Sequence, residues 1–149
     1  MKIVLIVCYM VIVFGQDLFV SNLNNECLEC LCYASTRCNL RSGCNGGYCG
    51  AYQIGYHYWK DAGSPTLPGN LPYFAGAFES CALTLSCARN TIKQYISKHG
   101  KDCNEDGITN CDDYAMINFN GASNCNQPLS SFSGREFWRR YIDCKTAQM

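Results

Sequence analysis

Cysteine is the residue type in this sequence with the greatest capacity for chemistry, since 13 of the 149 residues are cysteine. At this density cysteines form disulfides in a secreted chain or hold a metal ion through their thiolates. Cys27 and Cys30 have the spacing of a zinc-ligand pair, but no second pair of cysteine or histidine follows at the usual distance. His57 and His99 each stand alone. The pattern therefore favours disulfides over a zinc site.

The first fifteen residues account for the odd number of cysteines. Lys2 is followed by an apolar run over residues 3–14 that ends at Gly15, and this run is as long as a signal-peptide core but too short to span a membrane. We expect residues 1–15 to be a signal peptide, with a signal anchor as the alternative, and residues 16–149 to form the mature domain. The mature chain keeps twelve cysteines, which predicts six disulfides whose pairing cannot be deduced from spacing. The twelve are Cys27, Cys30, Cys32, Cys38, Cys44, Cys49, Cys81, Cys87, Cys103, Cys111, Cys125 and Cys144.

Charge and length limit the class of protein. Basic and acidic residues number 12 each, and loss of Lys2 with the signal peptide leaves a mature charge of about −1. Such a chain lacks the basic face that nucleic-acid binding needs. Its length allows one domain with a modest core. We expect a secreted, extracellular, monomeric protein with no nucleic-acid partner and no membrane span.

An oxygen-rich segment over residues 102–113 has the ligand spacing of a calcium loop. Side-chain oxygens stand at positions 1, 3, 5, 9 and 12, with Gly107 at position 6 and a backbone carbonyl at position 7. The candidate ligands are Asp102, Asn104, Asp106, Ile108, Asn110 and Asp113. The last ligand is aspartate instead of glutamate, and the apolar residue comes one place early. The alternative is an acidic turn between two cysteines, so calcium is an optional cofactor and none is required.

The spacing of apolar residues predicts several short helices. Residues 25–35 form a first helix that Asn24 or Asn25 caps, and residues 81–99 form the longest helix, which Gly100 ends in a left-handed conformation. Another helix spans residues 112–117. The last begins at a capping box made by Ser133 and Glu136.

The segments between these helices are less regular. Residues 41–50 hold four glycines and are expected to lack regular structure, whereas residues 51–59 favour a short strand or hairpin. Residues 63–72 contain three prolines and predict a surface loop. The sum is four or five short helices and one small sheet. The predicted fold class is α+β, mostly α, in a small disulfide-rich domain with a short β-hairpin.

Five motifs, in order and separated by cysteines, together resemble the invertebrate-type, or destabilase-type, lysozyme family. They occupy residues 27–32, 49–54, 58–63, 87–95 and 113–115, reading CLECLC, CGAYQI, YWKDAG, CARNTIKQY and DYA. The resemblance covers residues 27–144. It implies a lysozyme-like fold and a secreted antimicrobial hydrolase that cleaves β-1,4 glycosidic bonds of bacterial peptidoglycan. Some members of the family are also described as isopeptidases.

The resemblance also shows that both catalytic carboxylates are missing. Glycoside hydrolysis by this route needs a carboxylic acid and a second carboxylate about 5 Å away. In the family the acid stands three residues after the third cysteine of the first motif, where this chain has Ser35. The second carboxylate lies just before the CGxxQI motif, where the segment from Cys44 to Cys49 has no acid. A serine hydroxyl cannot donate a proton as a carboxylic acid does.

Isopeptidase chemistry lacks its residues as well. Family members with that activity carry serines beside the Cys-Gly motif and a histidine after the Tyr-Ala pair. Here Tyr48 precedes Cys49, and Asn118 takes the position of the histidine. No pair of nucleophile and base remains.

We therefore expect the protein to hydrolyse peptidoglycan weakly or not at all. Two alternative functions stay open. One is a non-catalytic protein that recognises peptidoglycan or another glycan. The other is an active glycosidase in which Glu26, Glu29 or Asp61 replaces the missing acid. Residues with aromatic faces, amides or hydroxyls could bind a sugar, or could instead pack in the core. These substrate-binding candidates are Tyr52, Gln53, Tyr56, Tyr58, Trp59 and Asn118.

Overall fold

The computed structural model describes residues 23–149, so the signal-peptide prediction lies outside the described residues. The elements, in chain order, are α1 (Asn25–Thr36), β1 (Cys44–Asn45), β2 (Tyr48–Cys49), β3 (Ile54–Gly55), α2 (Tyr56–Asp61), α3 (Ala77–Leu83), α4 (Leu85–His99), α5 (Cys111–Asn120), a 3-10 turn η1 (Ala122–Asn124) and α6 (Phe132–Ala147). The three strands form one antiparallel sheet in the order β1-β2-β3. The predicted class, mostly α with a small sheet, is confirmed. No helix of residues 23–149 is long and apolar enough to cross a membrane.

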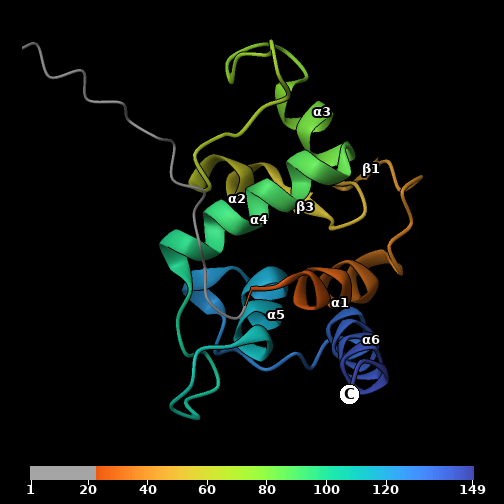
Figure 1. The fold of residues 1–149 in the computed structure, drawn as a ribbon, viewed down its shortest axis with the longest axis vertical. Coiled ribbons are helices and arrows are strands. Elements are labelled where there is room, and N and C mark those ends of the chain that lie inside the picture. Colours follow the sequence, from red (N-terminus) through yellow and green to blue (C-terminus); the bar gives the residue numbers. More distant parts are fainter. Residues whose placement is uncertain (1–22) are drawn as a thin grey trace, which may run out of the picture.

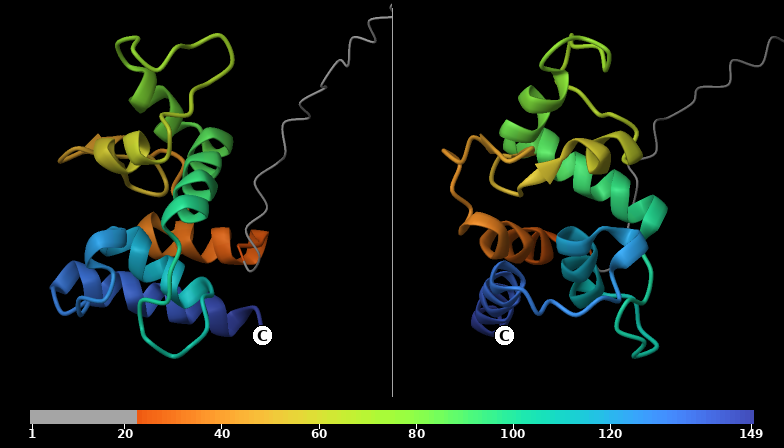
Figure 2. Two further views of the ribbon diagram at one scale, coloured as in Figure 1. Left: turned by 90° about the vertical axis from the view of Figure 1, so that its left-hand side faces the viewer. Right: turned by 180° about the vertical axis from the view of Figure 1, so that it is seen from behind.

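The elements form two groups with α4 between them (Figure 1). The sheet, α2 and α3 lie on one side of α4, and α1, α5 and α6 lie on the other, as the turned views also show (Figure 2). Helix α1 packs against α6, while α2 and α3 pack against α4. The buried side chains of both groups belong to one continuous core.

Helix α1 is fixed at both ends and along its length. The Asn24 side chain accepts a hydrogen bond from the Cys27 amide at 2.9 Å, as predicted, and Arg37 ends the helix at a φ of 56°. Disulfides join Cys27 to Cys111 in α5 and Cys30 to Cys144 in α6. These links close loops of 84 and 114 residues, for which the chain-entropy estimate of stabilisation is about 4 to 5 kcal/mol each.

All twelve predicted cysteines are paired, which confirms six disulfides. Of the four remaining links, three join cysteines five or six residues apart, and Cys103–Cys125 closes a longer loop of 22 residues that contains α5. The four links are Cys32–Cys38, Cys44–Cys49, Cys81–Cys87 and Cys103–Cys125.

The sheet lies where the sequence predicted irregular structure, so that prediction is wrong for residues 41–50. Strands β1 and β2 pair Asn45 with Tyr48 across a two-residue turn. Gly46 and Gly47 have φ angles of 60° and 85°, which this hairpin turn requires. The glycines therefore build the hairpin instead of preventing it. The predicted strand over residues 51–59 is reduced to β3, because residues 56–61 form α2 and bury Trp59 on one face.

The helix predicted over residues 81–99 is divided in two. Thr84 has an extended backbone, with φ −102° and ψ 118°, so α3 ends at Leu83 and α4 begins at Leu85. Gly100 follows α4, but its φ of −60° corrects the predicted left-handed stop. A Cβ at this position would lie 2.6 Å from the Ile96 carbonyl oxygen, so glycine is needed for close approach.

The last helix starts earlier than predicted. Ser131, and not Ser133, caps α6 by accepting a hydrogen bond from the Gly134 amide at 3.0 Å. Glu136 is therefore free of a capping role and pairs with arginines one turn further along. The side chain of Glu136 lines a hollow on the surface of the molecule.

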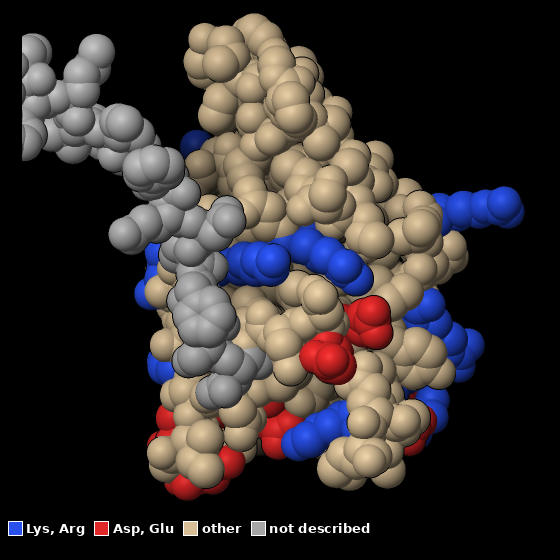
Figure 3. All heavy atoms as spheres, viewed as in Figure 1, with Lys and Arg blue, Asp and Glu red and all other residues tan. Residues whose placement is uncertain are grey.

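The acidic loop before α5 is organised by its own hydrogen bonds. Asp102 accepts from the amides of Asp106 and Gly107, and Asp106 accepts from the Ile108 amide. Asn110 caps α5, and acidic side chains gather at this end of the molecule, at the lower left of Figure 3. Among residues 23–149 no three acidic, histidine or cysteine side chains form a group suited to a metal ion. These contacts favour the acidic turn over a calcium loop.

Asp113 is the buried member of this loop. Its side chain is 0% exposed and accepts hydrogen bonds from the amides of Cys103 at 2.8 Å, Asn104 at 3.3 Å and Asn110 at 2.9 Å. A buried acceptor that satisfies several amides is costly to remove, because each amide is then left without a partner. Asp113 therefore holds the loop against the start of α5.

We predict that Asp113→Ala lowers the free energy of unfolding by about 2 to 4 kcal/mol, because the buried Cys103 amide and two partly buried amides lose their acceptor. Denaturant unfolding with the disulfides intact measures the change. The control is Asp106→Ala, an exposed residue of the same loop whose loss should cost less than about 1 kcal/mol. Equal losses for the two variants would contradict the role assigned to Asp113.

We also predict that the melting curve is the same in millimolar calcium and in chelator. The side-chain oxygens of Asp102 and Asp106 accept backbone hydrogen bonds, which hold the turn and compete with a metal ion for the same lone pairs. An ion that bound only the folded chain would raise the melting temperature by mass action. A rise with calcium that Asp106→Ala removes would instead establish the calcium loop.

Candidate functional site

A groove lies between the hairpin, α1, α5 and the first turns of α6. It consists of two adjoining hollows of about 430 and 560 Å³ that share Tyr48, Gln53, Asn118 and Phe119. We call the first the hairpin hollow, lined by residues 46–48, 53–58 and 118–121. We call the second the Ser35 hollow, and its lining is Ala34, Ser35, Tyr48, Tyr52, Gln53, Asn118, Phe119, Phe132, Ser133, Glu136, Phe137 and Arg140.

Ser35 lies in the groove, on the last turn of α1. Its hydroxyl donates to the Leu31 carbonyl at 2.9 Å and accepts from the Asn118 amide nitrogen at 3.5 Å. The position at which the family resemblance places the acid is therefore inside the groove, but its side chain is a hydroxyl held by its own helix. Within the described chain Ser35 forms no hydrogen bond with a histidine.

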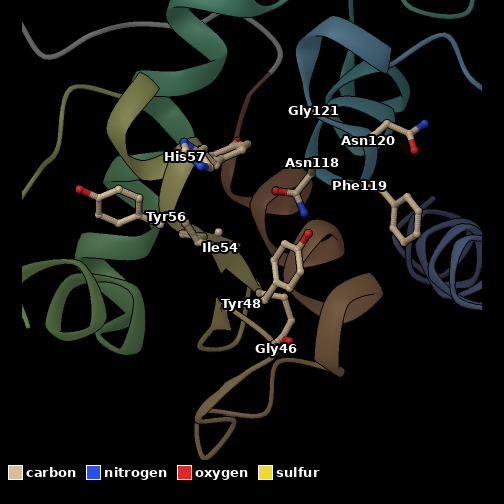
Figure 4. Close-up of a pocket in the computed structure, with 13 residues that line it drawn as sticks. Gly46, Tyr48, Ile54, Tyr56, His57, Asn118, Phe119, Asn120 and Gly121 are labelled. Atoms are coloured by element: carbon tan, nitrogen blue, oxygen red, sulfur yellow. The ribbon is translucent and has the colours of Figure 1, made fainter.

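The hairpin supplies the opposite wall without a carboxylate. Gly46, Gly47 and Tyr48 line the hairpin hollow, and the Tyr48 hydroxyl points toward Asn118 (Figure 4). The ring of Tyr48 is 56% exposed, so it is available for contact with a ligand. Asn118 and Tyr48 thus face each other across the groove, and neither carries a carboxylate.

Glu136 is the carboxylate that the described residues bring to the groove, and sequence reasoning missed it. It pairs with Arg139 at 3.1 Å and with Arg140 at 3.7 Å. The hydrogen bond from Arg139, with the charges of Arg139, Arg140 and Arg37, lowers the pKa of Glu136 below its usual value. A general acid needs a raised pKa, so Glu136 has the wrong protonation state for proton donation.

The three predicted substitute acids do not line either hollow. Glu26 and Glu29 are exposed on α1, and Glu26 borders a separate pocket with Asp112 and Lys145. Asp61 is exposed at the end of α2. The structure therefore gives no support to an active glycosidase that uses one of these residues.

Two of the predicted sugar-binding aromatics are core residues. Tyr52 and Trp59 are each 1% exposed, and their polar atoms bind the carbonyls of Leu28 and Pro65 at 2.9 and 2.7 Å. The prediction that Trp59 contacts a ligand is therefore wrong. Tyr52 borders the Ser35 hollow, but it does so as a core residue. Their rings fill the space beside α1 and α2, which the sequence alone does not distinguish from a groove.

The other candidates do line the groove. Tyr56 is 48% exposed, and Tyr58 stacks on Tyr95 with ring centroids 3.7 Å apart. Burial of the Tyr58 hydroxyl raises its pKa well above the usual value. Gln53 donates to the Gly50 carbonyl, which holds its amide at the shared part of the groove. Gln53, Tyr56, Tyr58 and Asn118 therefore remain as ligand candidates.

Several groove residues escaped the sequence patterns. Tyr48 and His57 stand beside the motifs, and Phe119 follows Asn118 on α5. Glu136 and Arg140 are four residues apart on α6, which places them on one helix face. This spacing in the sequence indicates that the two side chains lie together. That their helix face borders the groove follows only from the packing of α6 against α1.

Comparison with known proteins gives one consistent result. The sequence model described as Destabilase matches residues 24–144. A lysozyme of Magallana gigas is 27% identical over 126 residues, which cover 80% of this chain and 79% of that protein. Invertebrate-type lysozyme 3 of Caenorhabditis elegans is 32% identical over 104 residues, covering 67% of this chain and 73% of the relative.

Solved structures agree with the sequence comparison. The structure of Meretrix lusoria lysozyme in complex with PliI of Aeromonas hydrophila matches with a TM-score of 0.62 and 25% identity, covering 84% of this chain and 93% of that chain. Tapes japonica lysozyme matches with a TM-score of 0.58 and 23% identity, covering 79% of this chain and 87% of the other. The second likeness concerns the fold alone.

Proposed function

Because this chain belongs to the Destabilase family, whose members include invertebrate-type lysozymes, we propose that it is a secreted protein that binds peptidoglycan and hydrolyses it weakly or not at all. The groove is the binding site in this proposal. The reaction of the family is hydrolysis of β-1,4 glycosidic bonds. In this proposal the chain keeps the family fold and the groove, but it lacks the two carboxylates that the reaction needs.

The observation that carries this proposal is Ser35 at the acid position of the groove. Its hydroxyl is engaged with Leu31 and Asn118, and it cannot protonate a leaving oxygen at neutral pH. Glu136 borders the same hollow but stays ionised because of its arginine partners. The hairpin wall supplies no acid, so a second carboxylate is missing as well.

Retention of binding is supported by the surface that remains. The groove presents the exposed rings of Tyr48 and Tyr56 together with the amides of Gln53 and Asn118. A sugar ring has an apolar face and many hydroxyls, so it matches a wall of aromatic faces and hydrogen-bonding amides. A glycan other than peptidoglycan is the alternative ligand.

Secretion is supported by the covalent structure. Six disulfides within the described residues require an oxidising compartment such as the extracellular space. Isopeptidase activity lacks comparable support, since the hydroxyl of Ser35 binds a backbone carbonyl and an amide instead of a base.

We predict that the purified protein clears a peptidoglycan suspension at least about 100-fold more slowly than Meretrix lusoria lysozyme, because the general acid is absent. Turbidity measures the rate. Ser35→Glu is expected to remain slow, since the hairpin wall still lacks the second carboxylate. Clearing by the unmodified protein at the rate of the reference lysozyme would overturn the loss of hydrolysis.

We predict that Tyr48→Ala weakens retention on insoluble peptidoglycan about fivefold to tenfold, because the groove loses the exposed ring that lines both hollows. The matched control is Tyr73→Ala, a tyrosine that is 79% exposed and lines neither hollow. Trp59→Ala is unsuitable because that side chain is buried. Equal retention of the Tyr48 and Tyr73 variants would contradict binding in the groove.

A further inference from the structure

The Ser35 end of the groove carries an excess of arginine. The end of α1 and helix α6 bring three guanidinium groups and two carboxylates together, namely Arg37, Arg139, Arg140, Glu136 and Asp143. The full sequence has a formal charge of zero, with 12 basic and 12 acidic residues, and acidic side chains gather at the loop before α5. In Figure 3 basic side chains predominate along the right-hand edge, beside α1 and α6. Positive charge is therefore concentrated where the groove ends.

Arg140 is the member of this cluster that lines the Ser35 hollow. Its Nη1 donates to the Ala34 carbonyl at 3.4 Å, and its Nη2 lies 3.7 Å from Glu136 Oε2. Within the part of the chain that the structure describes, its buried Nε has no hydrogen-bond partner. An arginine has five N–H donors, so these contacts leave donors without an acceptor.

Glu136 does not neutralise Arg140 fully. Both of its oxygens already accept from Arg139, at 3.4 Å from Nε and 3.1 Å from Nη2. The distance from Glu136 to Arg140 is longer than a hydrogen bond. Arg139 also pairs with Asp143 at 2.9 Å and is half exposed outside the groove. Arg140 is consequently an arginine of the groove whose carboxylate neighbour, Glu136, lies beyond hydrogen-bond distance.

We propose that the Ser35 hollow binds a carboxylate group of the glycan ligand and that Arg140 is the residue that selects it. This inference rests on the glycan-binding function proposed above and names its ligand class. A carboxylate and a guanidinium form two parallel charge-assisted hydrogen bonds, which are stronger than bonds between neutral groups.

The serine at position 35 is part of the same argument. Ala34 and Ser35 are adjacent, and Arg140 already contacts the Ala34 carbonyl, so a carboxylate side chain at position 35 would lie beside the arginine. The Ser35 hydroxyl carries no charge, so Arg140 can pair with an anionic group of a ligand. With serine in place of an acid at position 35, the hollow has no reacting carboxylate and has space for a carboxylate of the ligand.

Peptidoglycan offers two sources of this chemistry. Every second sugar of its strand carries a lactyl carboxylate, which becomes an amide where a stem peptide is attached, and the stem peptides carry further carboxylates. Chitin has the same β-1,4 backbone without either group. Neutral and acidic oligosaccharides of equal length therefore differ in the feature that Arg140 would recognise.

The test is calorimetric titration of the mature protein with three tetrasaccharides: neutral chitotetraose, the peptidoglycan tetrasaccharide without peptides, and the same tetrasaccharide with stem peptides. We expect at least one acidic ligand to bind about tenfold more tightly than chitotetraose. Preference for the peptide-free ligand assigns the lactyl group, and preference for the peptide-bearing ligand alone assigns the stem peptide.

The variants identify the residue responsible. Arg140→Gln should bring the acidic and neutral ligands to similar affinities, whereas Arg139→Gln, its exposed neighbour, should keep the difference. Ser35→Glu leaves Arg140 in place and should also reduce the difference, which guards against a folding defect in Arg140→Gln. Equal affinity of the unmodified protein for acidic and neutral ligands would overturn this inference and leave the proposed groove intact. Binding of none of the three would overturn the proposed function itself.

Discussion

The two disulfides that leave α1 are the constraint on which the rest of the structure depends. Cys27 and Cys30 attach α1 to α5 and α6, which are 84 and 114 residues distant along the chain. The groove takes Ser35 from α1, Asn118 from α5 and Arg140 from α6. Because the three helices are joined covalently, these side chains keep their positions in a domain with a small core.

Hydrogen bonds attach the hairpin wall of the groove to α1 as well. The Tyr52 hydroxyl donates to the Leu28 carbonyl, and Thr36 donates to the Ala51 carbonyl at 2.6 Å. Both contacts connect the segment between β2 and β3 to α1. A sheet of three two-residue strands could not hold a wall in place unaided, since such short strands form few backbone hydrogen bonds. The width of the groove is thus set by α1 on both sides.

Local features of the fold could be predicted from the sequence, whereas the groove mostly could not. The Asn24 cap, the helices of α1 and α5 and the use of all twelve cysteines follow from rules that act over a few residues. The break at Thr84 comes from tertiary packing between α3 and α4, which overrides the continuous apolar pattern. Burial of Tyr52 and Trp59, and the approach of Glu136 and Arg140 to Ser35, depend on contacts between distant segments. The proposed acid position could be located from the sequence, because the family resemblance places it at a set distance from a cysteine.

The burial of Asp113 bears on how function is transferred between related proteins. This aspartate opens one of the motifs by which the chain resembles hydrolases, yet its buried oxygens accept hydrogen bonds from three backbone amides and hold the loop before α5. Tyr52 and Trp59, from two further motifs, are likewise core residues. Selection for folding alone would preserve these signatures after catalysis had been lost. Assigning activity from such motifs alone therefore tests for the requirements of folding, and it does not test for the side chains that react.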